Sequence, residues 1–246
     1  MDNIVYYVLS ALAVLITLTI HEYSHGYIAY KLGDDTAKNC GRLTLNPIAH
    51  LDPIGAICMV FFHFGWAKPV PIDPRNFKNP KRDFAYTAVA GPISNLLTAI
   101  ISAFIYLCAY AMLIKVNYAN DFTLALAQNT LDFIYIFHAV NIGIAIFNLI
   151  PVPPLDGSRV LNALLPAKIY FKLMRYERTT YLIFIAWLLL GGYASSFMLS
   201  IPMVASSPVL SGIARFLSLS DILGTVIEAI SDMIFKLFSL IPFLNV

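Results

Sequence analysis

The chain has 246 residues, of which 59% are hydrophobic and only 12% are charged, and its formal net charge at pH 7 is +2. Soluble domains are on average about 45–50% apolar and about 25% charged, so the composition excludes a large soluble domain and predicts a polytopic membrane protein. The chain has no basic patch interleaved with aromatic residues, and we therefore expect no nucleic-acid partner.

The first expected membrane span, Ile4 to Tyr30, carries the motif His21-Glu22-Tyr23-Ser24-His25. Helical residues i and i+4 differ by about 40° of rotation, so both imidazoles can face one metal ion. Glu22 lies about 100° further around and can reach a water molecule beside that ion without being a ligand. Such polar groups are costly in a membrane helix unless they are satisfied, so the motif indicates a functional site.

The segment after the first span is predicted to be irregular. Residues 42–45 alternate like a short strand or hairpin arm, and Ile54 to Ala67 is apolar but too short to span a membrane, which favours a re-entrant or interfacial segment. Residues 68–74 contain three prolines and are expected to be extended. The segments 42–45 and 68–74 are therefore candidates to pair with an unwound substrate as an added strand.

Three further spans are expected at Phe84 to Ile114, Phe133 to Ile150 and Tyr181 to Ile201. In the tail, charged residues recur every four positions on an otherwise apolar helix, which favours an amphipathic helix at the membrane interface over a fifth span; they are Glu228, Asp232 and Lys236.

We therefore expect an all-α membrane protein, a multi-span transmembrane helix bundle with a short re-entrant or β-hairpin region after the first helix. Residues 1–206 would form the core, and residues 207–246 a membrane-associated helical tail.

The charges of the loops predict the orientation. Lysine and arginine concentrate in residues 31–82 and 151–180, whereas the loop between the second and third spans contains only one of them, Lys115. The positive-inside rule then places both basic loops in the cytoplasm. The His21 end of the first span and the Asp156 end of the third span reach this same side, in a multi-pass protein of a prokaryotic inner membrane.

A catalytic zinc ion requires a third protein ligand beside His21 and His25. Asp156 follows an uncharged span and a run of prolines, so an unwound backbone could turn it inward, but it could equally cap the helix that follows. The rival third ligands are His50, Asp52, His63 and Asp73. His138 lies within a span, where a hydrogen-bonded packing role is as good an interpretation as a functional one.

Gly91-Pro92-Ile93-Ser94-Asn95 lies near the start of the second expected span. One interpretation is a helix kink at which Asn95 satisfies a neighbouring backbone group. The other makes Asn95 a polar contact for the substrate or for a developing oxyanion.

The three sequences HEYSH, AGPISN and FNLIPVPPLDG occur in this order, and together they resemble the site-2 protease family of intramembrane zinc metalloproteases, peptidase M50. The resemblance covers residues 4–165. It implies one Zn²⁺ per chain held by His21, His25 and Asp156, Glu22 as the general base, and Asn95 near the scissile carbonyl. The chain resembles a minimal form of the family, without a PDZ or CBS domain.

The resemblance implies an endopeptidase that cleaves membrane proteins within or next to their transmembrane segments. The expected partners are the transmembrane substrate, the lipid bilayer and a separate regulatory membrane protein. One alternative is a catalytically silent scaffold or chaperone, although all four catalytic positions are intact. Another is a metal transporter, although transporters usually carry paired repeats and this chain has none.

Overall fold

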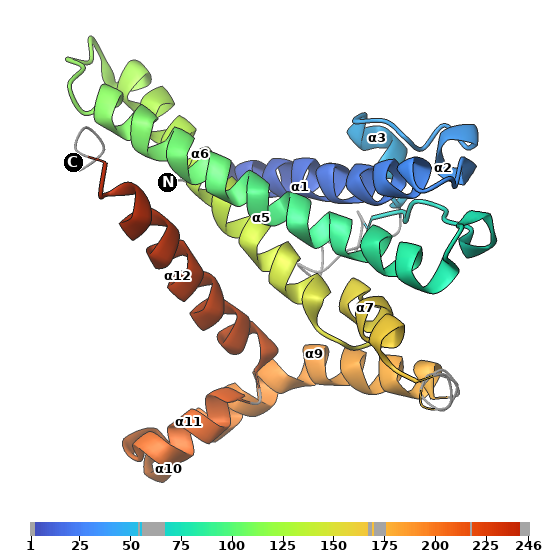
Figure 1. Ribbon diagram of the computed structural model, residues 1–246. Coiled ribbons are helices and arrows are strands. Elements are labelled where there is room, and N and C mark those ends of the chain that lie inside the picture. Colours follow the sequence, from blue (N-terminus) through green and yellow to red (C-terminus); the bar gives the residue numbers. More distant parts are fainter. Residues whose placement is uncertain are drawn as a thin grey trace.

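The computed structural model describes residues 3–53, 55, 67–166, 169, 176–216 and 218–241, and most of these residues are helical (Figure 1). The helices, in chain order, are α1 (Asn3–Lys31), α2 (Thr36–Asn39), α3 (Pro47–His50), the 3₁₀ helix η1 (Pro74–Asn76), α5 (Pro80–Leu113), α6 (Asp121–Leu149), α7 (Asp156–Leu164), α9 (Glu177–Leu199), α10 (Pro202–Ser206), α11 (Pro208–Phe216) and α12 (Leu219–Phe238).

Four of the described helices, α1, α5, α6 and α9, are long and apolar enough to cross a membrane. This confirms the predicted all-α, multi-span membrane protein. Figure 1 shows α1, α5 and α6 lying alongside one another, with α7 near the end of α6 and α9 below it.

Small and polar side chains allow the three long helices to approach closely. Ala99 and Ala103 of α5 and Ala145 of α6 are fully buried. Between α1 and α6, the Asn141 side-chain amide donates to Thr17 Oγ1 at 2.9 Å. Small residues and hydrogen bonds between helices are typical contacts in membrane bundles, where burial of apolar surface alone supplies little driving force.

The start of the third span was predicted wrongly. Helix α6 begins at Asp121 rather than near Phe133, because Asn120 and Thr123 form a reciprocal capping box. Hydropathy locates the apolar part of a membrane helix, whereas the cap decides where the helix itself begins.

The tail helix α12 packs on the bundle through one face and exposes the charged stripe predicted from the sequence. Ile234 is buried against Ala99, Ala103 and Ile142. His138 Nδ1 donates to the Ala99 carbonyl, and its Nε2 is 2.9 Å from the Ser231 hydroxyl, so the hydrogen-bonded packing role of His138 is confirmed.

The region between α1 and α5 is irregular, as predicted, but residues 42–45 form no strand and residues 43 and 44 form a bend, so the strand predicted there was wrong. Local hydrogen bonds replace a ladder: the His50 ring contacts the Thr44 carbonyl, and the Thr44 hydroxyl accepts from Asn46 N. A single antiparallel bridge, Leu51 to Ala67, is the β-pairing found in the described chain. The predicted re-entrant segment 54–67 lies mostly outside the described residues.

Candidate metal centre

Three side chains from two distant parts of the chain converge where α1, α5 and α7 meet. His21 and His25 lie one turn apart on α1, and their Nε2 atoms are 3.0 Å apart. Asp156 Oδ2, at the start of α7, is 3.1 Å from each of these nitrogens. All three residues are buried, and their ligand atoms could hold one metal ion.

The donor set fits zinc. Imidazole nitrogen and carboxylate oxygen bind zinc at about 2.0–2.2 Å, and a tetrahedral arrangement at such distances puts neighbouring donors about 3.3 Å apart. The separations of 3.0–3.1 Å are close to this value. Three protein donors also leave a fourth tetrahedral position open, as in catalytic zinc sites.

A hydrogen bond to α5 fixes the orientation of the His25 ring. Its Nδ1 donates to the Thr87 carbonyl on α5 at 2.7 Å, which leaves the Nε2 lone pair directed toward the other two donors. The Nδ1 atom of His21 is buried and has no partner among the described residues.

Asp156 is the first residue of α7, and Leu155 occupies the cap position, so the alternative of a capping aspartate was wrong. Burial raises the pKa of the Asp156 carboxyl, but its close contacts with the His21 and His25 rings outweigh this effect and hold the pKa below its ordinary value. The carboxylate is thus ionised, which is the form that binds metal.

Two glycines make the close packing possible. A Cβ atom at Gly91 of α5 would lie 2.5 Å from His25 Nε2 and 2.6 Å from His21 Cε1. A Cβ atom at Gly157 would collide with the Leu149 carbonyl oxygen. Glycine is therefore required at both positions for α5 and α7 to approach the site.

Glu22 is held on the other side of α1. Its Oε2 accepts a hydrogen bond from the backbone N–H of Val70 at 2.8 Å. Val70 belongs to segment 67–73, which is not helical, and its side chain lies beside Gly26 of α1.

Asn95 is fully buried one turn beyond Gly91, and its Nδ2 has no hydrogen-bond partner among the described residues. It therefore offers a free donor on the face of α5 that meets the two histidines.

The rival third ligands are not part of the described cluster. His50 contacts Thr44, Asp73 pairs with Arg75, and Asp52 accepts from Gly55 N. His63 lies outside the described residues.

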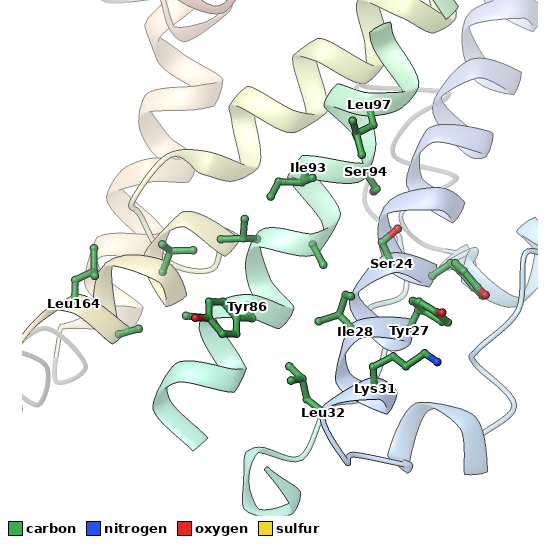
Figure 2. Close-up of a pocket in the computed structure, with 16 residues that line it drawn as sticks. Ser24, Tyr27, Ile28, Lys31, Leu32, Tyr86, Ile93, Ser94, Leu97 and Leu164 are labelled. Carbon is green, nitrogen blue, oxygen red and sulfur yellow. The ribbon is translucent and has the colours of Figure 1, made fainter. Parts of the chain in front are cut away.

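A groove of about 830 Å³ runs between α1, α5 and α7 beside the metal centre (Figure 2). Its lining is mostly apolar, with Ser24 and Ser94 on facing helices and Lys31 toward one end. Ser24 lies about 60° behind His21 around the helix and Glu22 about 100° ahead of it. The groove and Glu22 thus flank the histidines on opposite sides.

Three contributions to the site were not predicted from the sequence. These are the hydrogen bonds made by the Thr87 and Val70 backbones and the close packing of the histidine rings against Gly91. Thr87 acts through its backbone carbonyl, which every residue carries, and Val70 acts through its N–H, which every residue except proline carries, so no side-chain signal marks them. Gly91 was noticed, but only as part of a kink.

Comparison with known proteins identifies the family of the chain. The model of peptidase family M50 matches residues 9–191. The chain is 38% identical over 200 residues to a Bacillus subtilis (strain 168) protein named "Putative zinc metalloprotease YwhC", an alignment that covers 78% of this chain and 89% of the relative.

A more distant relative is "Zinc metalloprotease MJ0392" of Methanocaldococcus jannaschii, 24% identical over 68% of this chain and 38% of the relative. Another is "Putative zinc metalloprotease Rip2" of Mycolicibacterium smegmatis, 25% identical over 63% of this chain and 60% of the relative. No solved structure matches significantly. The extent of the family match and the identity to the first relative show that this chain belongs to peptidase family M50, the site-2 protease family, and is a metalloprotease of that family.

Proposed function

We propose that this metalloprotease is an intramembrane zinc endopeptidase that hydrolyses peptide bonds within or next to the transmembrane segments of other membrane proteins. The observation that carries the proposal is the buried cluster of His21, His25 and Asp156, with Glu22 beside it, inside a bundle of membrane-spanning helices.

Zinc held by the three ligands would polarise the scissile carbonyl and make a water molecule more acidic. Glu22 takes a proton from the attacking water as its oxygen bonds to the carbonyl carbon. The same carboxyl then delivers the proton to the amide nitrogen as the C–N bond breaks, which releases an amine and a carboxylic acid. The free Asn95 Nδ2 donates to the carbonyl oxygen as negative charge develops there.

We propose that the substrate span docks in the groove between α1, α5 and α7. The groove is apolar, as a membrane helix requires, and it borders His25 through Ser24 and Asn95 through Ser94. A helix buries its own amides in i to i−4 bonds, so the substrate must unwind locally before its carbonyl reaches the site.

The basic loops favour an orientation in which residues 68–82 and 159–178 lie in the cytoplasm of a prokaryotic cell. The metal centre then lies toward the cytoplasmic side of the inner membrane, and the released fragment enters the cytoplasm.

The test is co-expression with candidate single-span substrates, comparing wild type with Glu22→Gln. Gln is nearly isosteric but cannot accept the proton, so this variant should retain zinc and fold while cleavage is lost. Cleavage at the wild-type rate would refute the mechanism. Stabilisation of a partner without cleavage by either protein would favour the silent scaffold.

A further inference from the structure

We propose that the backbone N–H of Val70 is a positioning group for Glu22, and that the 67–73 segment exists to present this single donor to the general base. The inference rests on the proposed function in one respect, the role of Glu22 as the base.

The contact has the properties of a strong, directed hydrogen bond. The N–O distance is 2.8 Å, the donor residue is only 7% exposed, and the acceptor is a carboxylate. Hydrogen bonds to charged groups are roughly twice as strong as neutral ones.

The flanking prolines leave Val70 with the one backbone N–H of residues 69–71. Pro69 and Pro71 have no N–H, and the Lys68 N–H already donates to the His50 carbonyl at 2.9 Å. Residues 68–71 therefore have no free N–H, and a substrate strand could not accept a ladder of hydrogen bonds from them. This argues against the strand-addition role expected for this segment from the sequence.

The segment is fixed on both sides of Val70. The buried Arg42 side chain donates to the Lys68 and Pro69 carbonyls, and Ala67 bridges to Leu51. Beyond Val70, the Asp73 N–H donates to the buried Asp34 carboxylate at 2.8 Å.

Gly26 allows the segment to lie against α1. A Cβ atom at Gly26, one turn beyond Glu22, would be 3.2 Å from the Val70 side chain. The donor is thus held at a set height along α1, next to the carboxylate that it meets.

The hydrogen bond decides where the two carboxylate oxygens lie. Glu22 is adjacent in sequence to the ligand His21, and a mobile carboxylate there could rotate onto the metal as a fourth ligand or away from the reacting water. Because Val70 engages Oε2, Oε1 remains for proton transfer.

Hydrogen exchange tests the contact without any activity measurement. In residues 68–71 only Lys68 and Val70 have an exchangeable backbone amide, so the Val70 signal can be isolated and Lys68 serves as its internal control. Replacing Glu22 by Ala removes the acceptor and should speed exchange at Val70 by about 10- to 100-fold. The matched variant Glu22→Gln keeps an acceptor oxygen and should keep the protection, although both variants are inactive.

Equal exchange at Val70 in the two Glu22 variants would overturn the proposal. Equal acceleration at Lys68 and Val70 in Glu22→Ala would also overturn it, because it would mean release of the whole segment rather than loss of one hydrogen bond. Neither result depends on cleavage, so the contact can fail while the protease function stands, and the reverse.

Kinetics of a cleaved substrate test the role. Val70→Pro removes the N–H while retaining a three-carbon side chain, and it should lower kcat by about 10- to 100-fold with KM and zinc content unchanged. Ile72→Pro removes an N–H two residues away and should change kcat by less than about threefold. Equal kcat values for the two folded proline variants, or a Val70→Pro effect confined to KM, would refute positioning. If Val70→Pro does not fold, the exchange comparison still decides.

Discussion

A hydrogen atom takes the place of a side chain at Gly91, and this allows both imidazole rings to pack against α5. The two rings lie edge to face with centroids 4.5 Å apart. Any larger residue would occupy the space of the His25 ring, so the position is constrained as tightly as the ligands.

We expect Gly91→Ala to lose most bound zinc and to lower the stability of the fold by about 2 kcal/mol, since overpacking a close contact costs that order. The matched control is Gly224→Ala in α12, where a Cβ atom meets nothing within 4 Å. There alanine should be neutral or stabilising by about 1 kcal/mol. Zinc analysis and thermal unfolding of both variants test this. Full zinc occupancy in Gly91→Ala would contradict the packing argument.

Asp156→Ala should remove most of the zinc, because two histidines alone leave an incomplete site. Asp73→Ala is the control: this carboxylate is paired with Arg75 and should leave zinc content unchanged. Metal analysis of the purified variants is the measurement. A fully loaded Asp156→Ala protein would point to a different third ligand.

At the residue scale, the sequence predicted contacts between site residues that are close along the chain better than contacts between residues that are far apart. The convergence of His21 and His25 follows from helical geometry alone. Asp156 is 135 residues from His21. Whether it lies beside the two histidines or only caps the next helix depends on tertiary packing, which no local sequence pattern contains.

At the scale of elements, α5 contributes to both sides of the site. One face carries Gly91 and Asn95 toward the metal ligands, and another lines the groove with Ala90, Ile93 and Ser94. The apolar spans could be predicted from hydropathy. The boundaries of α6 and the course of residues 42–45 could not, because caps and side-chain contacts to the backbone decide them.

Filling the groove should block the substrate and spare the metal. Ala90→Trp places a large side chain in the groove, and we expect kcat/KM for a transmembrane substrate to fall about tenfold or more while zinc is retained. Ile101→Trp, on an exposed part of α5 that does not line the groove, is the control. Equal cleavage by both proteins would place the substrate elsewhere.

At the scale of the whole molecule, the orientation in the membrane can be measured. In a cysteine-free background, Lys78→Cys should be labelled by an impermeant thiol reagent only from the cytoplasmic face, and Lys115→Cys only from the outer face. Lys78 is exposed and lies in the basic loop before α5. Outer-face labelling at residue 78 would reverse the topology and move the metal centre to the other side.

The ligands are also divided between two parts of the chain, since His21 and His25 precede the loop between α5 and α6 and Asp156 follows it. A chain cut in that loop becomes a split protein in which neither fragment can complete the metal centre. When residues 1–116 and 117–246 are produced together, zinc bound by ligands from both fragments should stabilise their complex, and a chelator should weaken their association. Zinc retained by fragment 1–116 alone would show that the first part of the chain is sufficient.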